Sequence, residues 1–110
     1  MTGKRTSSFL NNCPIVCALN IIGQKWKIPI LWYLADEGTL RCNELKRALH
    51  GITNIMLAKF LQEMEGYGLI HREQYNTVSP KVEYSLTVHG QSIVPFLQEF
   101  DIWGATADGT

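Results

Sequence analysis

The sequence has no long hydrophobic run, no net charge and few cysteines. Its apolar runs are only a few residues long, which excludes a membrane-spanning helix. The polar N-terminus lacks an apolar core of signal-peptide length, so we expect a cytoplasmic protein. Ten Lys and Arg balance ten Asp and Glu, which excludes a protein that is basic over its whole surface. A local basic face remains compatible with this balance.

The charges are distributed unevenly along the chain. Residues 1–27 contain Lys4, Arg5, Lys25 and Lys27 and no acidic residue. Residues 82–110 contain four acidic residues and neither lysine nor arginine. The neutral total therefore hides a basic end and an acidic end.

The residue patterns of metal sites and of common enzymes are missing as well. Cys13, Cys17 and Cys42 form an odd set, which does not suit a secreted disulfide framework. Together with His50 they show no recognisable zinc spacing. There is no Ser-His-Asp or Cys-His arrangement and no glycine-rich phosphate loop. We therefore predict a protein that is not an enzyme, with no catalytic residue, metal or cofactor.

The apolar pattern of the 110 residues, of which 45% are hydrophobic, predicts one folded domain. Helical spacing predicts helices over about 14–22, 26–37, 44–49 and 54–67. The period then changes to two, which predicts a hairpin with strands over 69–75 and 82–86. After Thr87 a last helix carries a long apolar stripe, and Pro95 should either kink this helix or shift its start.

This order of elements predicts a mainly α protein with a small β-hairpin (α+β). Two helices joined by a short glycine-containing turn and followed by a hairpin form a winged helix-turn-helix. Asn43 and Thr53 are expected to cap these two helices. We expect a domain over 13–104 that includes N- and C-terminal dimerisation helices, a flexible arm over 1–12 and a flexible tail over 105–110.

Several short motifs follow one another in a fixed order along the chain. They are Cys13-Pro14, Gly23 to Lys27, Arg41 to Leu45, Gly51-Ile52-Thr53 with Met56-Leu57, Val82 to Thr87, Gly90, Pro95 and Trp103. In this order they resemble the HxlR-type transcriptional regulators, relatives of the MarR group, over about residues 13–104. The resemblance implies a dimeric, sequence-specific DNA-binding regulator.

The same resemblance implies that the helix after Thr53 enters the major groove and that the hairpin is the wing, against the DNA backbone or minor groove. The residue types on that helix suit these contacts. Thr53 can approach a phosphate, Asn54 and Gln62 can read adenine, and Lys59 can reach guanine or phosphate. Taken singly, each has an ordinary role as a cap or a solvated face, and only the set favours DNA. The predicted DNA contacts are Arg41, Lys46, Thr53, Asn54, Ile55, Ala58, Lys59, Gln62, Arg72 and Lys81.

The resemblance further implies a homodimer whose interface is formed by the first and last helices. The expected interface residues are Ile15, Leu19, Ile93, Leu97, Phe100 and Trp103. Some members of the family sense oxidants or electrophiles at the position of Cys13, where a helix start favours the thiolate. A small, half-buried structural cysteine is the alternative. The expected partners are double-stranded DNA, a second copy of the chain and a small-molecule or electrophile effector.

The leading prediction is a homodimeric regulator, acting as a repressor on a pseudo-palindromic operator. The alternative is a winged-helix protein–protein interaction module without DNA binding. Its motivation is the neutral charge, together with Ile55 and Phe60 on the predicted recognition helix. Relatives usually carry lysine at the position of Ile55, and we expect Phe60 to be partly buried.

Overall fold

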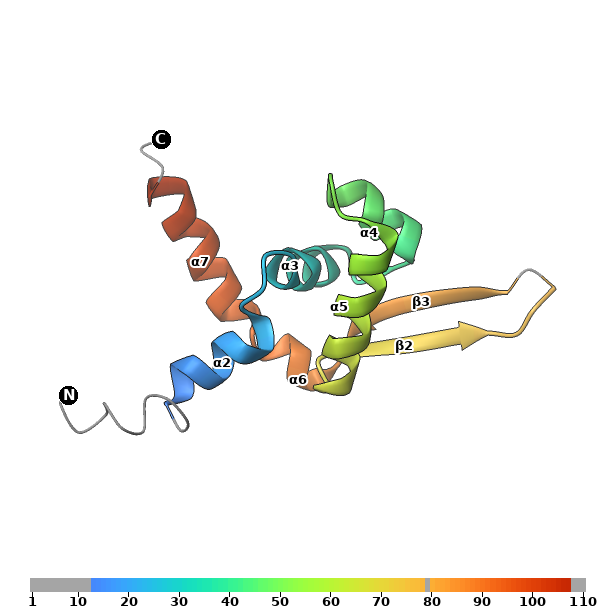
Figure 1. Cartoon of the computed structure of the whole chain (residues 1–110), viewed down its shortest axis with the longest axis horizontal. Coiled ribbons are helices and arrows are strands. Elements are labelled where there is room, and N and C mark those ends of the chain that lie inside the picture. The colour runs from blue at the N-terminus through green and yellow to red at the C-terminus, as the bar shows by residue number, and fades with distance from the viewer. Residues whose placement is uncertain (1–12, 79, 108–110) are drawn as a thin grey trace.

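The computed structural model of the chain describes residues 13–78 and 80–107. Its mainly helical architecture with a small sheet confirms the predicted fold class (Figure 1). The elements, in chain order, are α2 (Pro14–Ile22), α3 (Lys27–Glu37), β1 (Thr39–Leu40), α4 (Cys42–Ala48), α5 (Asn54–Gly66), β2 (Ile70–Tyr75), β3 (Lys81–Leu86), α6 (Val88–Gln91) and α7 (Val94–Ala107).

Two threonines and a glycine fix the local geometry around α5 and α6. The Oγ1 of Thr53 accepts a hydrogen bond from the Met56 N–H at 3.1 Å, which caps α5 as predicted. The Oγ1 of Thr87 accepts one from the Gly90 N–H at 2.9 Å and caps α6. Gly51 lies in the turn between α4 and α5 with φ of 99°, a conformation that favours glycine. Gly51 and Thr53 lie between α4 and α5, so they fix the way in which α5 begins after α4.

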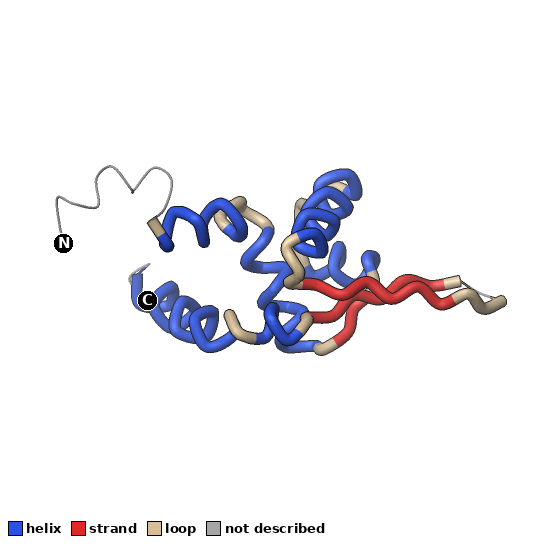
Figure 2. Tube along the Cα trace, turned by 90° about the horizontal axis from the view of Figure 1, so that it is seen from below, coloured by secondary structure: helices blue, strands red, loops and turns tan. Residues whose placement is uncertain are grey.

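The sheet has three antiparallel strands in the order β1-β3-β2. The hairpin pairs Ile70 with Leu86 at its base and Tyr75 with Lys81 near its tip. Beyond Ile70, every residue of β2 is exposed, so most of the hairpin extends away from the core (Figures 1 and 2). This is the geometry expected of a wing.

The core is centred on α3, which packs against α4, α7 and the sheet. Apolar side chains recur on α3 and α5 at helical spacing, and burying them supplies most of the stabilisation of such a fold. The large side chains that are almost fully buried are Ile30, Leu31, Leu34, Leu45, Leu57, Leu61, Met64, Ile70 and Leu97. Phe60 is only 6% exposed, so it is more deeply buried than predicted.

The structure corrects the predicted start of one helix and the extent of the last. Arg41, not Asn43, is the N-cap of α4, and its backbone N–H donates to Glu44 Oε1 at 2.8 Å. The expected last helix is two helices, α6 and α7. Pro95 is the second residue of α7, where the N–H it lacks would have no partner within the helix. Residues 105–107 continue α7, while 1–12 and 108–110 lie outside the described residues.

The molecule is elongated, with principal extents of 60 × 35 × 25 Å. Its radius of gyration is 16.1 Å, whereas a compact chain of this length would have about 13 Å. Figures 1 and 2 show why: the hairpin projects from one end, and α2 and α7 project from the other. In Figure 1, α2 and α7 diverge from each other as they leave the core.

Candidate nucleic-acid interface

Helix α5 has one buried face and one exposed face. Leu57, Phe60, Leu61 and Met64 point into the core. The opposite face is exposed, and it carries five of the predicted DNA contacts, namely Asn54, Ile55, Ala58, Lys59 and Gln62. Thr53, also exposed, stands at the start of this face. The face combines donors, acceptors, one cation and one large apolar side chain, which are the groups that read base edges in a major groove.

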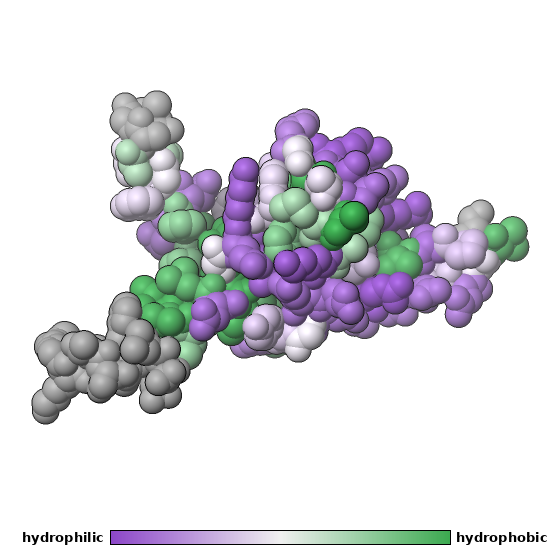
Figure 3. All heavy atoms as spheres, viewed as in Figure 1, coloured by the Kyte–Doolittle hydropathy of each residue, from purple (hydrophilic) through white to green (hydrophobic). Residues whose placement is uncertain are grey.

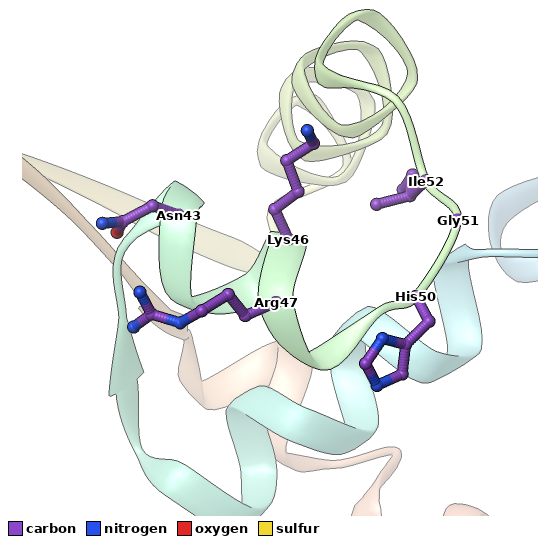
Figure 4. Close-up of a pocket in the computed structure, with 6 residues that line it drawn as sticks. All are labelled: Asn43, Lys46, Arg47, His50, Gly51 and Ile52. Atoms are coloured by element: carbon purple, nitrogen blue, oxygen red, sulfur yellow. The ribbon is translucent and has the colours of Figure 1, made fainter.

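A concave basic surface lies beside the start of α5 (Figure 4). Its volume is about 750 Å³, and its lining residues are Asn43, Lys46, Arg47, His50, Gly51 and Ile52. In Figure 4, Lys46 extends from α4 toward α5, Arg47 extends toward Asn43, and His50 lies past the end of α4. The lining includes two cations and no carboxylate. This surface, which we call the α4 hollow, therefore suits a phosphate.

Arg47 and His50 were not among the predicted contacts. From Asn43, positions 46 and 47 follow at three and four residues and share one face of α4, and position 50 continues the same spacing just past the end of the helix. That spacing is visible in the sequence. The concavity depends on how the Gly51 turn folds back over the helix, and this only the structure reveals.

The two predicted wing cations differ in their surroundings. Arg72 is exposed on β2 and lies opposite Tyr84 of β3. Burial is the main reason that the pKa of Tyr84 is raised, and Arg72 opposes this effect. Lys81 is half-buried; its Nζ lies 3.5 Å from Glu83 Oε2 and 5.0 Å from the centre of the Tyr75 ring. Lys81 is thus engaged by Glu83 and Tyr75, whereas Arg72 is exposed and interacts with Tyr84.

An ion pair between the buried Lys27 and the partly exposed Glu63 holds the back of α5. Lys27, the first residue of α3, is 2% exposed, and its Nζ lies 2.9 Å from Glu63 Oε1. The hydrogen bond from Lys27 is the main reason that the pKa of Glu63 is lowered. The Nζ also lies 5.9 Å and 5.8 Å from the centres of the Phe60 and Tyr67 rings. Lys27 thus joins α3 to α5 and is not available to DNA, which its place in a basic segment of the sequence did not indicate.

A second exposed surface, formed by α2 and α7, is apolar. In Figure 3, hydrophobic surface gathers over α2, at the end opposite the hairpin, whereas hydrophilic surface predominates around α4 and α5. Phe96, Phe100 and Trp103 form a ladder of stacked rings along α7, with centroids 5.6 Å and 6.1 Å apart. We call this surface the arm surface; its strongly exposed residues are Ile15, Leu19, Phe96, Phe100, Ile102 and Trp103.

Four of the six predicted interface residues lie on the arm surface, and two do not. Leu97 is 2% exposed and belongs to the core of its own chain, so its predicted place in a dimer interface does not fit. The reason is that α7 packs on α3 through the side that carries Leu97. Ile93 is partly buried and lines a cavity of about 280 Å³ between α2, α6 and α7. Phe96 and Ile102 were not predicted.

The three cysteines occupy different environments. Cys13 is the N-cap of α2 and is 6% exposed, whereas Cys17 and Cys42 are exposed. No disulfide joins any of them within the chain. Across residues 13–78 and 80–107, no group of three or more His, Cys, Asp or Glu is arranged to hold a metal ion.

Comparison with known proteins relates this geometry to a family. The sequence model of the HxlR-like helix-turn-helix family matches residues 21–108. The chain belongs to this family. It is 45% identical over 92 residues to the helix-turn-helix transcriptional regulator YybR of Bacillus subtilis, covering 84% of this chain and 73% of YybR.

Solved structures of similar regulators superpose closely on the chain. The redox regulator HypR in its reduced form gives a TM-score of 0.84 at 39% identity, over 88% of this chain and 95% of HypR. Its oxidised form gives 0.81 at 41% identity, over 86% and 96%. The fold is therefore a winged helix-turn-helix, with α4 and α5 as its two helices and β2–β3 as its wing.

Membership of the HxlR-like family settles the broad class of the protein. It is a transcriptional regulator of the helix-turn-helix type, a fold that binds DNA, and it is not an enzyme. The match from residue 21 to 108 includes α3 to α7 but neither Cys13 nor most of α2. Among the residues that the structure describes, no helix is long and apolar enough to cross a membrane.

Proposed function

We propose that this HxlR-like regulator acts as a homodimer that binds a pseudo-palindromic operator and represses transcription. In this proposal α5 lies in the major groove, the α4 hollow holds a backbone phosphate, and Arg72 contacts the backbone beside the wing. The observation that carries it is the exposed face of α5 next to the α4 hollow, because one surface then offers both base-reading groups and phosphate-binding cations.

The shape of the molecule supports the dimer. The arm surface lies at the end opposite the wing, so two copies can join through it without covering either DNA-binding face (Figure 2). A two-fold dimer of this kind presents two copies of α5, which should meet half-sites about one helical turn of DNA apart or a multiple of it. Apolar side chains exposed together on neighbouring helices commonly mark such an interface.

The salt dependence of DNA binding tests the proposal. Duplex from the region upstream of the regulator's own gene should bind tightly, and a duplex with two half-sites should bind far more tightly than one with a single half-site. In a dimer, Lys59→Ala removes two phosphate contacts. Each phosphate contact contributes roughly 0.9 to the magnitude of the slope of log K against log salt, so the slope should become less steep by about 1.8. Lys81→Ala is the matched control. It also removes one positive charge per protomer, but Lys81 is paired with Glu83, so the slope should change much less.

Two results of this titration would count against the proposal. Equal affinity for one and two half-sites would overturn the dimeric readout. Absence of salt-dependent binding to every duplex would instead favour the protein–protein interaction module.

We further propose that oxidation or alkylation at Cys13 changes operator affinity. Cys13 begins α2, a helix of the arm surface, and a modified thiol no longer fits a site that is 6% exposed. The relative HypR is described as a redox regulator and is known in reduced and oxidised forms.

The redox proposal predicts that the oxidant diamide, which takes two electrons and two protons from a pair of thiols, alters operator affinity in the wild type. Cys13→Ser should remove the response, whereas Cys17→Ser and Cys42→Ser, as matched controls, test whether another thiol is required. The measurement is a DNA titration before and after diamide and after reduction with dithiothreitol. An unchanged response in Cys13→Ser would show that Cys13 is not the sensor.

A further inference from the structure

One large apolar side chain stands apart on the reading face of α5. Ile55 is 82% exposed, although the other large apolar side chains of this helix are buried or half-buried. It is the second residue of α5, in the turn that a recognition helix directs toward the bases. Ala58 follows one turn later on the same face and is also exposed. The two residues form a short apolar strip between Asn54 and Lys59.

The packing of the chain itself gives Ile55 no role. Helix starts are often fixed by an apolar contact between the residue before the cap and the fourth helical residue. Here these positions are Ile52 and Leu57, which are 4% and 2% exposed. The arm surface is formed by α2 and α7, which project from the end of the molecule opposite the wing, so a dimer joined there leaves the exposed face of α5 uncovered (Figure 1). The side chain is therefore available to a ligand of α5.

The chemistry of the major groove limits what Ile55 can recognise. Its side chain has neither donor nor acceptor. Among the four normal bases, the only apolar group exposed in the major groove is the C5-methyl group of thymine. We infer that Ile55 is a specificity-determining residue that contacts a thymine methyl in each half-site. This inference rests on the proposed function and names the base that part of the α5 surface reads.

Replacing thymine by deoxyuridine tests the inference, because it removes the methyl group and leaves base pairing intact. In the operator duplex from the titration above, thymines are replaced one symmetric pair at a time. Burial of one methyl group implies about a four-fold loss of wild-type affinity per half-site, and about 15-fold when both half-sites are changed. Ile55→Ala should bind the thymine and deoxyuridine duplexes equally well.

Two further variants make the result specific. Ile55→Val keeps a branched apolar side chain and should retain most of the discrimination. Val88→Ala removes a side chain that is 90% exposed on α6, away from the reading face, and should discriminate as the wild type does. Circular dichroism and the affinity for unmodified duplex check that each variant is folded.

The outcomes separate this inference from the proposal beneath it. If the wild type binds its operator but no deoxyuridine pair weakens binding, or if Ile55→Ala still discriminates, the inference is overturned and the proposed function stands. If no duplex binds at all, both are overturned.

Discussion

Replacing Phe100 and Trp103 together by alanine should leave each protomer folded but unable to form a dimer. Their side chains are 43% and 64% exposed, and their rings stack on each other, so they contribute much of the arm surface and little of the core. If a second copy buries both rings, each truncation costs about 3–5 kcal/mol of association free energy. That is at least a hundred-fold in the dimer dissociation constant for each ring. Sedimentation equilibrium over a range of concentrations measures this loss.

Tyr75→Ala is the matched control for the arm variant. Tyr75 is an aromatic residue with a similar exposed fraction, 38%, but it lies on the hairpin. Its removal should leave the dimer intact. A dimer that persists unchanged in Phe100→Ala/Trp103→Ala would show that the interface lies elsewhere.

A methyl group added at Gly90 should destabilise the fold by about 1–3 kcal/mol. A Cβ at this position would lie 2.1 Å from the backbone oxygen of Leu69 and 3.3 Å from Leu86 Cδ2. The same oxygen accepts a hydrogen bond from the Thr87 N–H at 3.0 Å. The close contact therefore joins α6 to the base of the wing, and backbone must move to admit the methyl group.

Gly66→Ala provides the opposite expectation for the same chemical change. Gly66 is the last residue of α5, and nothing lies within 4 Å of an added Cβ. Alanine should stabilise the helix by up to about 1 kcal/mol, because it has the higher helix propensity. Urea denaturation of both variants gives the comparison. Equal midpoints for Gly90→Ala and the wild type would contradict the close approach at Leu69.

The parts of the fold that local sequence signals determine were predictable. Thr53 and Thr87 cap the helices that follow them, because a threonine oxygen satisfies an N–H at a helix start wherever the helix packs. The predicted start of α4 was wrong. Asn43 is the better N-cap by residue type, but the backbone N–H of Arg41 donates a hydrogen bond to Glu44, which places the N-cap at Arg41. The break between α6 and α7 had one signal, Pro95, which was equally compatible with a kinked helix.

The site was predictable where it depends on one helix and not where it depends on several. The amphipathic pattern of α5 was enough to place Asn54, Lys59 and Gln62 on its exposed face. An apolar stripe on a helix does not show which surface buries it. Leu97 was therefore predicted to lie in the dimer interface, although it packs in the core of its own chain. Lys27 is buried in an ion pair with Glu63, which is 36 residues later in the sequence. No local sequence pattern predicts such a long-range contact.

Because the molecule is elongated, a small rotation at one end produces a large displacement at the other. The arms are at one end of a body 60 Å long, and the wing is at the other. A rotation of about 4° at the arms would displace the wing tip by about 4 Å, which exceeds the roughly 3.4 Å between successive base pairs. In the proposed dimer, a change at the start of α2 that is too small to unfold any element would therefore be magnified at the wing tip into a displacement of about one base-pair step along the double helix.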